Sequence, residues 1–159
     1  MRALLAGLLC LVSWQAAADD MRPFMRGSWA ALRQAHQGNP TVVHFWGLTC
    51  GPCIVELPRW AALLRERSDL NLVLIAADPV PEEPAELGRF LARAGLSVSE
   101  NWNFADRFVE RLQYEVDPRW HGELPRTMLI GRDGKVTTIA GTSEPADIRA
   151  WLDAQAAAR

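Results

Sequence analysis

The motif Cys50-Gly51-Pro52-Cys53 constrains the possible folds of this chain more than any other feature. It follows an apolar run over Thr41–Trp46 that predicts a buried strand, and it opens a segment, Pro52–Arg67, whose apolar residues recur at helical spacing. Cys50 would then lie where the helix begins, and the free N–H groups and macrodipole there favour a thiolate. Cys53 would lie one turn further, within reach of a disulfide to Cys50. The pattern predicts a cysteine pair that cycles between thiols and disulfide.

Two other roles are open to such a pair. A structural disulfide between Cys50 and Cys53 would enclose so little chain that its effect on the entropy of the unfolded state is small. A zinc site would need two further ligands, and the sequence offers as histidines only His36, His44 and His121 and has no second Cys-x-x-Cys. The residues therefore favour redox chemistry, and we expect neither a metal nor a cofactor.

The segment FWGLTCGPC, residues 45–53, resembles the active-site segment of the thioredoxin superfamily. Pro58 lies where thioredoxins carry the proline that kinks the active-site helix, and Leu124-Pro125-Arg126-Thr127 resembles their cis-proline loop. The long segment between the first strand pair and this loop is similar to that of periplasmic TlpA/ResA-like thiol–disulfide oxidoreductases. The resemblance implies an α/β, thioredoxin-like fold: a central mixed β-sheet flanked by helices, with a TlpA-type helical insertion.

The resemblance also implies roles for individual side chains. Cys50 would attack a substrate disulfide, and Cys53 would resolve the mixed disulfide that results. The Leu124–Pro125 bond would be cis, so that the backbone of Leu124 could pair with a substrate strand. Trp46 would pack beneath the cysteines and contribute to the same substrate-binding site, although core packing alone explains this tryptophan equally well.

Four further residues have two possible roles each. His44 occupies the position of a buried acid that helps move the proton of the second cysteine in thioredoxins, and it could take that proton because the ordinary pKa of histidine is near neutrality. It could equally be a neutral core residue with a satisfied hydrogen bond. Asp78 lies near an acid of TlpA-type reductases, but its place before a proline favours a turn residue. For Trp120 and His121, a surface loop is slightly favoured over the substrate groove.

Periodicity and turn signals predict the remaining elements. Strands are expected over 41–46 and 71–77, parallel to each other, over 101–104 as a short strand or turn, and as a hairpin over 126–131 and 135–141. Helices are expected over 28–36 with Ser28 as cap, 52–67, 85–94, 105–114, and 144–156 with Ser143 as cap. Residues 19–27 are expected to be irregular.

The N-terminus has the pattern of an export signal. Met1-Arg2 gives a positive start, Ala3–Val12 an apolar run, and Ala16-Ala17-Ala18 a small-residue cleavage site. We expect a signal peptide over residues 1–18, cleaved near Ala18, and one thioredoxin-like domain over residues 19–159 in the periplasm. An uncleaved anchor is less favoured, because the apolar run is short for crossing a bilayer.

The sequence thus predicts an exported thiol–disulfide oxidoreductase, with the reductase direction favoured. Its partners would be protein disulfide substrates and a membrane thiol–disulfide electron donor, and a monomer is expected. Nucleic acid is not expected as a partner, because 17 Lys and Arg against 19 Asp and Glu give a net charge of −2 without a basic stripe. The alternative is a thioredoxin-fold copper chaperone that holds Cu(I) with the same thiols and does not turn over.

Overall fold

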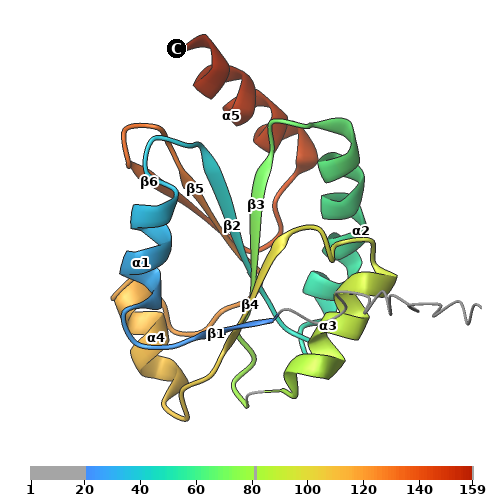
Figure 1. Cartoon of the computed structure of the whole chain (residues 1–159), viewed down its shortest axis with the longest axis vertical. Helices are drawn as coiled ribbons and strands as arrows, with labels where there is room; N and C mark the ends of the chain where they lie inside the picture. The colour runs from blue at the N-terminus through green and yellow to red at the C-terminus, as the bar shows by residue number, and fades with distance from the viewer. Residues whose placement is uncertain (1–20, 81, 159) are drawn as a thin grey trace, which may run out of the picture.

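The computed structural model describes residues 21–80 and 82–158 (Figure 1). The expected signal peptide and its cleavage site therefore lie outside the described residues. The elements in chain order are β1 (Arg22–Phe24), α1 (Ser28–Ala35), β2 (Thr41–Trp46), α2 (Gly51–Glu66), β3 (Asn71–Ala76), α3 (Pro84–Arg93), β4 (Glu100–Phe104), α4 (Val109–Val116), β5 (Arg126–Ile130), β6 (Val136–Ala140) and α5 (Pro145–Ala157). None of these helices is long and apolar enough to cross a membrane.

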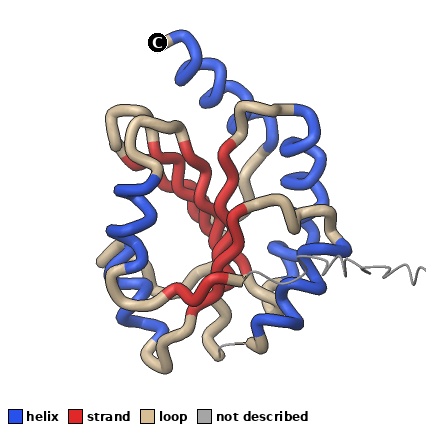
Figure 2. The backbone as a smooth tube through the Cα atoms, in the orientation of Figure 1, coloured by secondary structure: helices blue, strands red, loops and turns tan. Residues whose placement is uncertain are grey.

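Six strands form one mixed sheet in the order β1-β4-β3-β2-β5-β6. β2 pairs in parallel with β3 through the crossover helix α2, and it pairs antiparallel with β5, which continues into the β5–β6 hairpin. Helices α2 and α3 cover one face of the sheet, and α1 and α4 cover the other (Figures 1 and 2). The expected fold class, a mixed sheet flanked by helices, is confirmed.

Strand β2 is one of the two central strands of the sheet, and all six of its residues are buried. Because side chains alternate along a strand, Val42 and Trp46 enter the cluster beneath α2, while Val43 and Phe45 enter the cluster beneath α1 and α4. The strand that leads to the cysteines is thereby fixed from both faces.

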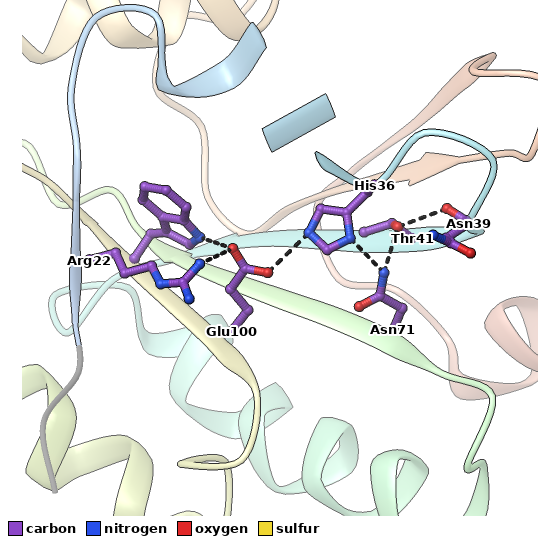
Figure 3. A network of polar contacts seen from close by, with 7 residues as sticks. Arg22, His36, Asn39, Thr41, Asn71 and Glu100 are labelled. Carbon is purple, nitrogen blue, oxygen red and sulfur yellow. Dashed lines mark hydrogen bonds and ion pairs between the residues drawn. The ribbon is translucent and has the colours of Figure 1, made fainter. Parts of the chain in front are cut away.

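The prediction that residues 19–27 are irregular is wrong for Arg22–Phe24, which pair in parallel with β4. A polar network at this end of the sheet holds the strand (Figure 3). Glu100 accepts from Arg22 at 2.9 Å and lies 3.0 Å from Nε2 of His36, whose Nδ1 lies 2.8 Å from the side-chain nitrogen of Asn71. These contacts come from four separate segments, so local sequence patterns do not reveal the strand.

Helix α4 begins at Val109, later than the predicted start at residue 105. The cause is Asp106, whose carboxylate accepts the backbone N–H of Phe108 at 2.9 Å and so holds the preceding residues in a turn. Phe108, the N-cap residue of the helix, is consequently 39% exposed.

Two predicted helix caps are also wrong. Gly27 is the N-cap residue of α1, while the hydroxyl of Ser28 accepts the N–H of Met25. Glu144 is the N-cap residue of α5, and the hydroxyl of Ser143 instead donates to Glu56. The second difference brings the start of α5 into contact with the helix that carries the cysteines.

Candidate active site

The cysteines lie where β2 gives way to α2. The helix begins at Gly51, so Cys50 is its N-cap residue, and Cys50 and Cys53 form a disulfide with a Cα–Cα distance of 5.3 Å. The backbone N–H of Cys53 donates to Sγ of Cys50 at 3.3 Å. The donor and the N-terminal end of the helix both stabilise negative charge at Sγ of Cys50.

The two cysteines differ in access. Cys53 is completely buried, whereas Cys50 is partly exposed and is followed by the exposed residues Gly51 and Pro52. An incoming disulfide can therefore approach Cys50 but not Cys53. The geometry suits Cys50 as the attacking sulfur and Cys53 as the sulfur that resolves the intermediate from inside.

The Leu124–Pro125 peptide bond is cis, as the resemblance implied. Leu124 and Cys50 are both partly buried and border the same apolar cluster beneath α2. Trp46 belongs to that cluster, is completely buried and stacks on Phe90 with ring centroids 5.8 Å apart. Trp46 thus supports the site from below, and direct contacts of Trp46, Leu124 and Pro125 with a substrate stay predictions.

Trp120 lies neither in a surface loop nor beside the cysteines. Only 4% of it is exposed, and its ring packs 4.8 Å from that of Phe45 on the other face of the sheet. Its indole N–H donates to the carbonyl of Glu123 at 3.0 Å. The expected surface position is wrong because the loop before Pro125 folds back onto the core.

Asp78 organises the segment that precedes Cys50. It is buried, and its carboxylate accepts the N–H of Leu48 at 2.9 Å, the N–H of Thr49 at 3.1 Å and the hydroxyl of Thr49 at 2.8 Å. A Cβ atom on Gly47 would lie 2.5 Å from Oδ1 of Asp78, so glycine is required there. Asp78 is therefore more than the turn residue that the sequence favoured, because it ties the end of β3 to the cysteine turn.

His44 is completely buried on the face of β2 that α2 covers. Its Nδ1 lies 2.9 Å from the hydroxyl of Thr127, and the centroid of its ring lies 5.0 Å from the ring centroid of Trp60. Burial disfavours the imidazolium and lowers the pKa of His44 to about 3. The ring is therefore neutral near neutral pH, which favours the core-histidine alternative, and a role as proton acceptor stays a prediction.

Glu56 is the candidate that sequence reasoning missed. It is buried one helical turn after Cys53, and one carboxylate oxygen accepts both the N–H of Ser143 at 2.8 Å and its hydroxyl. The other oxygen lies 3.9 Å from Nε2 of His44 and has no hydrogen-bond partner among the described residues. Burial raises the pKa of Glu56, although the bonds from Ser143 oppose that shift. One available signal was an acidic residue on the inward stripe of α2.

The buried histidine predicts a loss of stability in acid. Between pH 6.5 and about 3 the unfolded chain binds a proton at His44 that the folded chain does not, so the free energy of unfolding falls as the pH falls. Glu56 acts in the opposite sense, since its raised pKa makes stability fall as pH rises above its ordinary value. We therefore compare slopes: between pH 7 and 5.5 the free energy of unfolding of the wild type should fall by about 1.3 kcal/mol more than that of His44→Gln.

Urea denaturation at the two pH values measures this difference. The exposed His121, exchanged for Gln, is the matched control and should keep the wild-type slope. Equal slopes for wild type and His44→Gln would mean that His44 takes up a proton as readily in the folded protein as in the unfolded chain, which would contradict the lowered pKa.

Comparisons with known proteins agree with this geometry. The thiol–disulfide oxidoreductase ResA of Geobacillus thermodenitrificans is 28% identical over 119 residues, which cover 74% of this chain and 64% of the relative. ResA of Halalkalibacterium halodurans is 28% identical, with 72% and 60% covered. The chain thus spans less than two thirds of the length of these curated relatives. No protein-family profile matches the chain.

Solved structures show the same fold. A secreted Mycobacterium tuberculosis disulfide oxidoreductase homologous to Escherichia coli DsbE has a TM-score of 0.60 at 20% identity, with 76% of this chain and 85% of that chain covered. StoA of Bacillus subtilis has a TM-score of 0.55 at 19% identity, with 72% and 83% covered. The chain therefore has a thioredoxin-like fold. With the Cys-Gly-Pro-Cys motif, the chain is similar to the ResA/TlpA-like proteins of the thioredoxin superfamily.

Proposed function

We propose that this protein is an exported thiol–disulfide oxidoreductase that reduces disulfides of protein substrates. One observation carries the proposal: a partly exposed cysteine at the start of a helix is linked to a completely buried cysteine one turn further. The similarity to ResA proteins named as thiol–disulfide oxidoreductases supports the same activity.

The reaction takes two exchanges. The thiolate of Cys50 attacks one sulfur of the substrate disulfide, whose S–S bond breaks as a mixed disulfide forms and the other substrate sulfur leaves as a thiolate. Cys53 then loses its proton and attacks Sγ of Cys50, which releases the second substrate thiolate. The substrate gains two electrons and the Cys50–Cys53 pair loses two, so a thiol donor must reduce the pair again. In an exported protein that donor would lie in the membrane.

The second exchange needs an acceptor for the proton of Cys53. His44 and Glu56 are buried titratable groups on the α2 side of the sheet, and Glu56 is one turn from Cys53. A carboxylate whose pKa is raised can hold such a proton near neutral pH better than an imidazole whose pKa is about 3. Glu56 is therefore the stronger candidate, and His44 would position it.

Export is part of the proposal. The pattern over residues 1–18 supports it, as does the similarity to a protein described as secreted. Intact mass of the native protein tests it: a chain that starts near Asp19 supports a cleaved signal peptide, whereas a start at Met1 indicates an anchor.

Insulin reduction tests the activity. With dithiothreitol as the electron donor, catalytic amounts of the protein should precipitate the insulin B chain through many turnovers. Stoichiometric binding of Cu(I) without turnover would instead support the copper chaperone.

A further inference from the structure

We propose that the outer edge of β6 binds an extended segment of the client protein as an added strand, and that the groove beside this edge selects an acidic side chain. The inference rests on the proposed function and names its substrate class: unfolded or extended clients. It uses a surface that the cysteine chemistry does not involve.

Strand β6 ends the sheet, and its ladder with β5 fixes which backbone groups face outward. Gly131 donates to the carbonyl of Lys135, and Gly141 donates to the carbonyl of Pro125, both at 2.9 Å. Because hydrogen-bonded pairs alternate along an antiparallel ladder, the residues between these two in the same register also bond inward at every second position. The N–H and C=O groups of Val136, Thr138 and Ala140 therefore point away from β5.

The two edges of the sheet differ in how they are protected. β1 has three residues, with Pro23 at its centre and the charged Arg22 before it, and both features discourage strand addition. β6 has five residues in unbroken register, VTTIA, with no proline and no charge. Its threonines, Thr137 and Thr138, are exposed and favour extended backbone. Among the described strands, the chain thus protects one edge and leaves the other open for pairing.

A groove of about 220 Å³ lies beside this edge on the side of α1 and α4. Trp29, Met128 and Val136 give it an apolar lining, and Arg33 and Arg119 contribute positive charge. The Arg119 side chain is 90% exposed and lies 3.4 Å from Asp117, but Asp117 also binds the buried Arg126. One carboxylate therefore faces two guanidinium groups, and the groove suits an added acidic side chain next to an apolar one.

The outer edge of β6 lies close enough to the cysteine site for one client segment to reach both. Gly141, directly after β6, bonds to Pro125 of the cis-proline loop. A strand added to β6 would lie three strand spacings from β2, or about 14 Å. About five extended residues span that distance. A client held on β6 could thus present a disulfide to Cys50 about five residues from the bound segment.

Charge complementarity also decides between the two occupants that could cover the edge. In a second copy of this chain, β6 would bring valine, threonine, isoleucine and alanine, with no carboxylate for Arg33 and Arg119. A client segment that carries an acidic residue satisfies both the backbone groups and the charge. We therefore assign the edge to a client segment.

The test uses synthetic peptides of about ten residues: a strand-forming segment Val-Thr-Glu-Thr-Val, whose valines share the face of the glutamate, a Gly/Ser linker of about five residues, and a cysteine in mixed disulfide with thionitrobenzoate. Attack by reduced protein joins Cys50 to the peptide sulfur and releases coloured thionitrobenzoate. The glutamate peptide should react about fivefold faster than its lysine counterpart, and Arg119→Glu should reverse the order.

The backbone part is tested by a matched pair at one position. Thr138→Pro removes an outward N–H and should slow the glutamate peptide about fivefold, whereas Thr138→Ala keeps the N–H and should react like wild type. All variants should reduce the small disulfide dithionitrobenzoate at the wild-type rate. If Thr138→Pro does not fold, protection from hydrogen exchange at Val136, Thr138 and Ala140 in oxidised wild type with added peptide replaces it.

The outcomes separate the two levels of the proposal. No reaction of wild type with dithionitrobenzoate would count against the oxidoreductase function itself. Normal reaction with that reagent, but equal rates for both peptides and both Thr138 variants, would overturn the strand-addition site alone. A dimer in sedimentation that Thr138→Pro dissociates would also overturn it, because a second copy would then be the occupant.

Discussion

Exchange of Cys50 for serine should reduce the turnover of insulin to the uncatalysed rate. The serine hydroxyl is not ionised near neutral pH and cannot be the attacking group in thiol–disulfide exchange. Cys53→Ser should instead attack once and stop, because Cys50 still opens the substrate disulfide but nothing resolves the product. Mass spectrometry should then find a stable mixed disulfide on Cys50. The pair of variants separates the first sulfur from the second.

Alkylation of the reduced wild type provides the independent check of this order. Brief treatment with iodoacetamide at neutral pH should label Cys50 and spare Cys53, since Cys53 is completely buried. Thermal unfolding of each variant against reduced wild type controls for loss of the fold. Preferential labelling of Cys53, or mixed disulfides that accumulate on Cys50→Ser, would reverse the assignment.

Asp78→Ala should lower the free energy of unfolding by about 3 kcal/mol and should loosen the segment before Cys50. The substitution removes the acceptor of three hydrogen bonds and leaves the N–H groups of Leu48 and Thr49 without it in a partly buried position. Urea denaturation measures the stability, and hydrogen exchange at these two amides measures the local effect.

Asp153→Ala is the matched control for Asp78→Ala. Asp153 is also an aspartate with a short polar contact, 2.9 Å from the guanidinium of Arg67, but its side chain is 70% exposed. An exposed ion pair contributes little, so this variant should have nearly wild-type stability. Equal and small effects of the two substitutions would show that Asp78 does not hold the cysteine turn.

The parts of the fold that the sequence predicts are those in which local pattern and burial agree. The nearly continuous apolar runs at Thr41–Trp46 and Asn71–Ala76 are short and rich in branched residues, which predicts strands buried on both faces, and the spacing between them leaves room for one crossover helix. The β5–β6 hairpin follows from the turn residues around Asp133. In each case the deciding residues lie close together in the chain.

The missed features depend on contacts between distant segments. Glu56 bonds to Ser143, which is 87 residues away, and the same contact takes Ser143 from its predicted role as a helix cap. Strand β1 needs Glu100 and His36 to hold Arg22 and the sheet edge together. Asp78 looked like a turn residue because its three donors belong to a loop 29 or 30 residues earlier. Motif spacing located the cysteines, but the polar groups around them required the fold.

The equilibrium reduction potential of the Cys50–Cys53 pair tests the central claim, a disulfide reductase, most directly. Gly51 and Pro52 carry no charge, and the contacts described for Sγ of Cys50 include one N–H donor, so the thiolate lacks the added stabilisation of strongly oxidising thiol proteins. Equilibration with dithiothreitol or glutathione buffers, read by alkylation, should give a potential near that of thioredoxin, about −270 mV. A value more oxidising than about −180 mV, the level of protein disulfide isomerase, would contradict the account and indicate an oxidase or isomerase.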